Sequence, residues 1–311
     1  MISAAEMDVA GSINEFPDRF GPVFVRDLRQ GLRNSLFIWI FIILQVVCLV
    51  ATLTELAVLQ ILGDSVQGPF LSGAFMLTMW ITFSTVLPLC HLGTLQSELG
   101  PGRNIELLLT SQLSRWQLVR GKLLVASSLS LVTMGSILPY LLVRYFFGGL
   151  ELLNALSLVG SLLIFNATGN AVVIGASAIR NYVGRIATII FFFIWWTSAL
   201  GATAALVTSR GTASFWNNSL QIASVSMISM LFLIYGLQLG RMRLRVAVSP
   251  MDQSSAIVVY ILAFFSFIVL IVAQVSGGVI ATLIVSGILL WLALSIDGDS
   301  KEKKRLKGLS P

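Results

Sequence analysis

Charged and chemically reactive side chains are scarce in this chain. Only 11% of its 311 residues are charged, against roughly 25% in soluble domains. The single histidine, His91, cannot build a zinc site that needs two histidines on one helix. No G-x-x-x-x-G-K-(S/T) phosphate loop occurs either. We therefore expect no catalytic site, no metal, no cofactor and no ATP hydrolysis by this chain.

Cysteine is nearly absent too. Cys48 and Cys90 both lie inside apolar runs, at different expected depths, so we expect small buried packing residues and no disulfide. The first 35 residues contain no short apolar core followed by a small-residue cleavage site. No signal peptide is therefore expected.

Long apolar runs, by contrast, fill the chain from Ser35 onward. A hydrocarbon core of about 30 Å needs roughly 20 apolar residues in a helix, and backbone groups in lipid must be bonded internally. The sequence thus predicts an all-α polytopic membrane protein with about eight transmembrane helices. They are expected at 36–62, 70–96, 123–143, 152–178, 186–208, 220–240, 256–275 and 279–296.

The spans leave no room between them for a soluble domain of ordinary size. We expect a cytoplasmic N-terminal segment over 1–35 and a six-helix core over 36–240 with a cytoplasmic polar loop at 98–122. Residues 241–311 are expected to form a transmembrane hairpin and a basic cytoplasmic tail. The hairpin turn would be Val275-Ser276-Gly277-Gly278.

Basic residues are distributed unequally between the two sides of these spans. With the N-terminus in the cytoplasm, all of the 20 Lys and Arg residues except Arg144 and Arg210 fall inside. The positive-inside rule then predicts a multi-pass protein of the cell (inner or plasma) membrane with both termini cytoplasmic. The net charge of +6 follows from this topology and from attraction to anionic lipid, so no nucleic-acid partner is expected.

A short amphipathic helix is expected just before the first span, starting at Pro22. Its apolar face carries Phe24, Val25, Leu28 and Leu32. Its basic face carries Arg26, Arg29 and Arg33. One interpretation is an interfacial anchor on the inner leaflet. The other is a helix that also touches a cytoplasmic partner.

The polar loop contains the sequence signals of a helix break, a short helix and the start of the third span. Gly100-Pro101-Gly102 breaks the preceding helix, and Asn104 is a suitable N-cap for a short leucine-rich helix. Ser114 with Gln117 three residues later forms the capping-box pattern of the third span. Arg115, Trp116, Arg120 and Lys122 follow, residues typical of a headgroup-level anchor.

At these residues the chain resembles type-2 ABC-transporter permeases. Their segment after the second helix reads roughly E-L-L-L-(T/S)-x-P-(L/V)-S-R-x-x-(I/L)-(V/L)-x-G-K-(L/I). Here the corresponding run is Glu106-Leu-Leu-Leu-Thr-Ser-Gln-Leu-Ser-Arg-Trp-Gln-Leu-Val-Arg-Gly-Lys-Leu-Leu. Gln112 stands where the family usually has proline, and Pro101-Gly102-Arg103-Asn104 replaces a short glycine-threonine lead. The run from Pro22 to Gln30 also resembles the N-terminal helix of that family.

The resemblance implies a permease subunit that couples a separate ABC ATPase to substrate translocation, with export the commoner direction. It also implies a second permease subunit, identical or different. The implied partner-coupling residues are Glu98, Ile105, Glu106, Leu107, Leu108, Leu109 and Arg115. The family usually has six spans, so the C-terminal hairpin is an addition. The alternative is a non-transporting membrane scaffold or assembly protein.

Asn166 and Asn170 share one face in the middle of the fourth span. They either form hydrogen bonds between packed helices or line a translocation path. Gln45 and Gln274 carry the same two interpretations. His91 is interpreted as a packing residue, with a proton switch as the alternative.

Overall fold

The computed structural model describes residues 22–62, 78–96, 115–146, 152–179, 181–209, 215–248 and 254–295. In these residues every regular element is helical, as the sequence predicts. The elements are α2 (Pro22–Leu32), α3 (Ser35–Leu62), the π-helix η3 (Thr82–Val86), α5 (Leu87–Leu89), α8 (Arg115–Phe146), α9 (Leu152–Ser177), α10 (Tyr182–Ser209), α11 (Phe215–Val248) and α12 (Ser254–Ser295).

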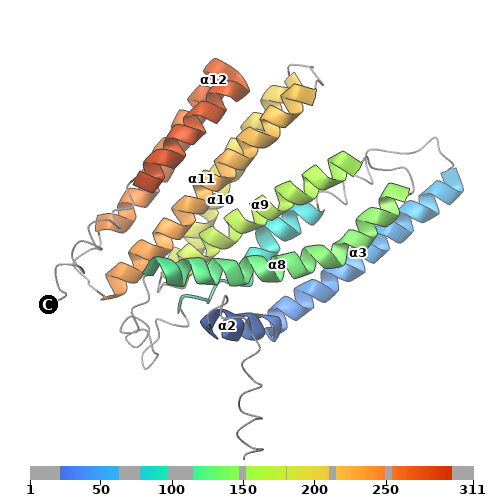
Figure 1. Cartoon of the computed structure of the whole chain (residues 1–311), viewed down its shortest axis with the longest axis horizontal. Coiled ribbons are helices and arrows are strands. Elements are labelled where there is room, and N and C mark those ends of the chain that lie inside the picture. Colours follow the sequence, from blue (N-terminus) through green and yellow to red (C-terminus); the bar gives the residue numbers. More distant parts are fainter. Residues whose placement is uncertain are drawn as a thin grey trace, which may run out of the picture.

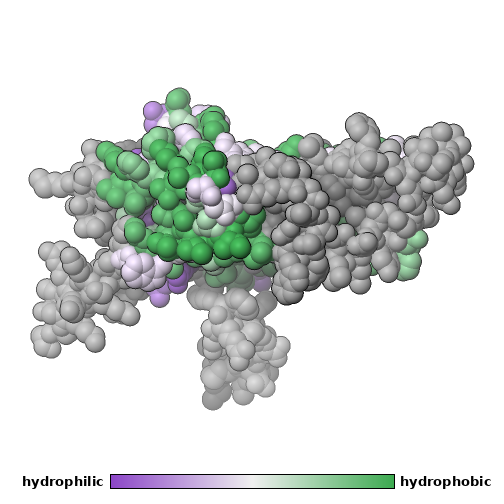
Figure 2. All heavy atoms as spheres, turned by 90° about the horizontal axis from the view of Figure 1, so that it is seen from above, coloured by the Kyte–Doolittle hydropathy of each residue, from purple (hydrophilic) through white to green (hydrophobic). Residues whose placement is uncertain are grey.

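Six of the described helices are long and apolar enough to cross a membrane: α3, α8, α9, α10, α11 and α12. Large hydrophobic side chains remain exposed along α3 and α12, among them Trp39, Ile43, Val272 and Trp291. Figure 2 shows one such hydrophobic face. Outward-facing apolar residues along many helices are what a lipid environment requires, so the chain is a multi-pass membrane protein.

Helices α3, α8, α9, α11 and α12 follow one another across the bundle, with α10 beside α9, α11 and α12 (Figure 1). The closest approach is between α9 and α11. A Cβ added to Gly175 would lie 2.2 Å from the Gly236 carbonyl oxygen. The hydroxyl of Thr168 also donates to the Ser229 carbonyl at 3.0 Å. The two helices thus touch backbone to backbone.

The second predicted span, 70–96, is not one regular helix where the structure describes it, from Thr78 onward. A π-helix at Thr82–Val86 leads into α5, and turns occupy Cys90–Leu95. Pro88 gives part of the reason, because proline has no N–H to donate to the preceding turn. The Leu87 N–H bonds the Thr82 carbonyl five residues back. With the same five-residue spacing, the Phe83 carbonyl would accept a hydrogen bond from the N–H of residue 88. Residue 88 is proline and has no N–H to donate.

Helix α12 is interrupted at Gly278, which has φ 68° and ψ −150°. This backbone conformation is essentially restricted to glycine. The chain reverses at this point. Tyr235 bonds Ser266, and one turn further along α11 Gln238 bonds the Ala293 carbonyl. Along one straight helix those two α12 residues would stand about 40 Å apart at ~1.5 Å per residue.

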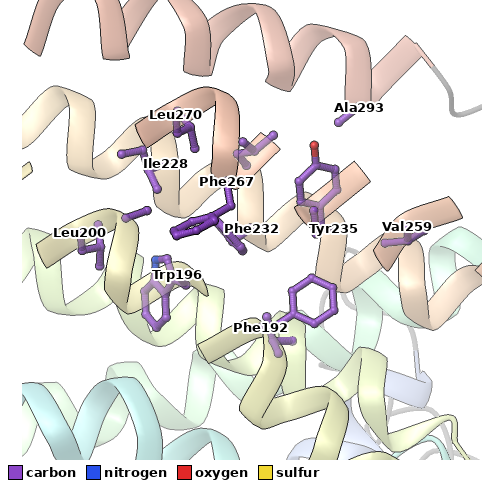
Figure 3. Close-up of a cluster of buried hydrophobic side chains, with 14 of the residues drawn as sticks. Phe192, Trp196, Leu200, Ile228, Phe232, Tyr235, Val259, Phe267, Leu270 and Ala293 are labelled. Carbon is purple, nitrogen blue, oxygen red and sulfur yellow. The ribbon is translucent and has the colours of Figure 1, made fainter. Parts of the chain in front are cut away.

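The largest buried cluster joins α9, α10, α11 and both arms of α12 (Figure 3). Phe192, Trp196, Phe232 and Tyr235 form its aromatic centre, with Trp196 donating its indole N–H to Ser229. Ala293, in the part of α12 after Gly278, also belongs to the cluster and lies on a separate ribbon in Figure 3. The C-terminal arms are therefore packed into the bundle. Cys48 and Cys90 are both free.

Candidate functional site

The two described flanks of the polar loop meet at one end of the bundle. Helix α8 begins at Arg115, so residues 115–122 of the predicted loop are helical and the third span starts earlier than predicted. Leu95 precedes the remaining part of the loop, Val119 lies in the first turns of α8, and both are fully buried. Gly240, near the end of α11, touches both: a Cβ there would lie 3.4 Å from Val119 and 3.6 Å from Leu95. Leu95 and Val119, on either side of residues 97–114, therefore pack on the same small patch of α11.

The first flank is held by Arg185, from the first turn of α10, whose side chain is only 4% exposed. Its guanidinium donates to the Leu92 carbonyl at 3.0 Å, to the Ile179 carbonyl at 3.1 Å and to the Gln96 side chain. Since the turn from Cys90 to Leu95 lacks a regular helical ladder, these donors replace part of it. The sequence predicts Arg185 only as one of the cytoplasmic basic residues of the topology.

The Ser177 hydroxyl completes this support. It accepts the Leu95 N–H at 3.2 Å and donates to the Ile174 carbonyl at 2.7 Å, within its own helix α9. The segment before the loop is thus fixed by both α9 and α10.

The second flank is held by a buried ion pair. The Lys122 ammonium lies 2.6 Å from Asp27 Oδ2, and each side chain is 8% exposed. Arg26 binds the other carboxylate oxygen at 3.0 Å. The sequence predicts Lys122 as a headgroup-level anchor, but its side chain is buried inside the protein. Its charge is satisfied inside the protein because α2 brings a carboxylate to it.

Helix α2 forms over Pro22–Leu32, close to the predicted range. Its Phe24 and Leu28 pack against the cluster formed by α3, α8 and the second span. A Cβ on Gly31 would meet Leu129 of α8 at 2.7 Å. Leu32 is 42% exposed and lies outside this contact. The apolar face of α2 thus rests largely on the chain itself.

The basic face of α2 points away from the bundle. Arg26, Arg29 and Arg33 are all exposed, while Asp27 between them is buried. Attachment of these arginines to the inner leaflet stays a prediction. Asp27 is a functional candidate that sequence reasoning missed. Its signal was a single carboxylate in an otherwise basic helix.

Most of the predicted coupling residues lie outside the described residues. These are Glu98, Ile105, Glu106, Leu107, Leu108 and Leu109. Arg115 is the first residue of α8, and its side chain is also outside the description. Their contact with a partner stays a prediction, and the structure contributes the flanks that position them.

The two midspan asparagines lie inside the bundle and bind each other. Asn170 donates to the Asn166 side-chain oxygen at 2.7 Å, and Asn166 donates to the Phe83 carbonyl at 2.8 Å. That carbonyl is the one left without a main-chain donor by Pro88. Both side chains are at most 1% exposed. These bonds fit the packing interpretation, and the translocation role stays a prediction.

Gln45 and Gln274 also form interhelical bonds, to the Ser136 hydroxyl and the Ala199 carbonyl. His91 is buried at the start of the turn that Arg185 holds. Within the described ranges, no group of three or more metal-ligating side chains comes together.

No protein-family model, no curated protein and no solved structure matches this chain.

Proposed function

We propose that this chain is the membrane-spanning permease subunit of an ABC transporter. The observation that carries the proposal is the run from Glu106 to Leu124, together with its place in the fold. The run continues from 106–114, outside the described residues, into α8, and Leu95 and Val119 on either side of that segment pack at Gly240 at one end of a multi-pass helical bundle. Because the residues on both sides of 97–114 pack against the bundle, a displacement imposed on this segment by a partner would reach the helices.

In the proposed arrangement the core is completed by the second span, and α12 counts as two spans because it reverses at Gly278. That gives eight spans, with a six-helix permease core, a C-terminal hairpin and both termini cytoplasmic. The membrane is the cell (inner or plasma) membrane. The partners are a separate ATPase, which hydrolyses ATP, and a second permease subunit, and the direction is export.

The proposed coupling step follows from the chemistry of the loop. An ATPase groove would bury the leucines after Glu106 and pair its carboxylate with a basic residue. Movement of the loop would reach α8 directly, since α8 begins at Arg115, and would pass from α8 to α2 through the Lys122–Asp27 contact. It would reach α10 through Arg185. Both links are buried and polar, and such bonds are electrostatically stronger inside a protein than in water.

The test is to purify the tagged chain from native membranes and to measure the ATP hydrolysis of the protein that copurifies with it. Glu106→Lys should reduce bound ATPase activity about tenfold or more, because unpairing a desolvated charge costs several kcal/mol. Glu151→Lys is the matched control, since it makes the same change on the predicted outer side and should leave activity unaltered.

Equal ATPase binding by wild type and Glu106→Lys would contradict the role of Glu106. If the wild-type chain carries no ATPase at all, the permease proposal fails, and the membrane-scaffold alternative replaces it.

A further inference from the structure

The second span changes its hydrogen-bond spacing where it packs against α9. Over Thr82–Val86 it is a π-helix, whose main-chain bonds reach back five residues instead of four. A Cβ added to Gly169 of α9 would lie 2.6 Å from the Ser84 carbonyl oxygen and 2.7 Å from Pro88 Cγ. The π-helix and the proline after it therefore lie directly against the backbone of α9.

Pro88 leaves one carbonyl of this segment without a main-chain donor in either spacing, because proline has no N–H. With the five-residue spacing, called here the π register, that carbonyl belongs to Phe83. With the four-residue spacing of an α-helix, the α register, it would belong to Ser84. The buried side chain of Asn166 donates to the Phe83 carbonyl at 2.8 Å. Asn166 thus supplies the donor that the π register lacks.

This bond decides which register is the more stable. The Ser84 carbonyl lies against Gly169, which has no side chain to donate a hydrogen bond. A buried carbonyl without a donor is destabilising, so Asn166 favours the π register over the α register. Without the Asn166 bond each register would leave one carbonyl unpaired. The α register would then be favoured, because π-helices are intrinsically rare.

Asn170 offers the Asn166 amide a second acceptor. Asn170 donates to the Asn166 side-chain oxygen at 2.7 Å, while its own Oδ1 is buried and accepts no hydrogen bond from the described residues. The two asparagines are one turn apart on α9, so the Asn166 amide can reach that oxygen by rotating. The Asn170 amide nitrogen would keep the Ser130 hydroxyl, which lies 3.5 Å away. The Asn166 amide therefore has an acceptor in both registers.

We propose that the second span is a register switch: Asn166 holds it in the π register, and release of that bond lets it take the α register. Loss of the extra residue would turn the segments before and after the π-helix relative to each other by about 100° and shift them by ~1.5 Å. The segment after it leads to the polar loop through Leu95. A role of the switch in coupling rests on the proposed function, whereas the two registers do not.

The test measures the register in full-length protein in lipid nanodiscs, with Cys48 and Cys90 replaced by alanine. Spin labels are attached at Gly160→Cys on α9 and at either Ile81→Cys, before the π-helix, or Gly93→Cys, after it. All three positions are exposed, and a Cβ on either glycine meets nothing within 4 Å. Double electron–electron resonance then gives one distance from α9 to each side of the π-helix.

Asn166→Leu should change at least one of the two distances. The change can reach about 8 Å, the chord of a 100° turn at the ~5 Å radius of a helix surface. Asn170→Leu is the matched control: it removes the neighbouring amide but leaves the donor to Phe83, so both distances should equal those of wild type. Elution as a single symmetric peak checks that each variant is folded.

Pro88→Ala tests the same switch without removing a hydrogen-bond donor. It restores the N–H at residue 88, so the α register becomes fully bonded, and it should change the distances as Asn166→Leu does. If Asn166→Leu does not elute as a single peak, Pro88→Ala decides the question.

The proposal is overturned if folded Asn166→Leu or Pro88→Ala keeps both wild-type distances, or if Asn170→Leu changes them equally. The measurement involves no ATPase. Failure of the register switch therefore leaves the permease proposal standing, and absence of a bound ATPase leaves the register switch standing.

Discussion

The buried pair of Asp27 and Lys122 ties the helix before the first span to the segment that follows the loop. Two charges taken out of water cost free energy that their attraction offsets only when both are present. Asp27→Asn should therefore destabilise the protein by about 3–5 kcal/mol, the cost of leaving a buried charge without its partner. Thermal denaturation in detergent, followed by size-exclusion chromatography, measures this.

The paired replacement makes that prediction sharper. Asp27→Asn with Lys122→Met removes both charges and should be more stable than Asp27→Asn alone. Arg29→Ala, on the exposed face of the same helix, should change stability by no more than about 0.5 kcal/mol. If Asp27→Asn behaves like Arg29→Ala, the pair does not hold α2 in place.

At the scale of elements, the shortest distance from a Cβ placed on a described glycine to another atom is found between α9 and α11. Gly175→Ala would place a methyl group 2.2 Å from the Gly236 carbonyl oxygen, a backbone atom that cannot rotate away. The helices must separate, and overpacking of this kind typically costs about 1–3 kcal/mol. We expect a lower denaturation temperature for this variant.

Gly160→Ala on the same helix is the matched control, because a Cβ there meets nothing within 4 Å. Alanine is the better helix former by about 1 kcal/mol, so this variant should be as stable as wild type or more so. Equal behaviour of the two variants would show that α9 and α11 are not in backbone contact.

At the scale of the whole molecule, segments predicted on one side of the membrane do gather at one end of the bundle. Leu95, Val119 and Gly240 meet there, and Gln238 brings Ala293 close to the same end of α11. This geometry agrees with the charge count, although which side that end faces stays a prediction.

Reporter fusions test the orientation. A reporter active only outside the cytoplasm should be active when fused after Gly149 or Gly277, and inactive after Arg185 or Lys307. The reason is the uneven distribution of Lys and Arg, which resist translocation. Activity after Arg185 would reverse or renumber the spans.

Composition and apolar run length were enough to determine the membrane-spanning class, the helical fold and most helix positions, because these depend on local hydrophobicity and backbone satisfaction in lipid. The helix from Pro22 was readable from its periodicity, and the break near Gly278 from two adjacent glycines.

Tertiary structure alone decided which polar side chains serve which backbone groups. Asn166 reaches the Phe83 carbonyl, Arg185 holds the turn before the loop, and Lys122 turns inward to Asp27. Arg241 joins Arg120 at Trp116 in the same way. Such pairings depend on how helices far apart in sequence cross, and hydrophobic patterns along one helix carry no information on that crossing.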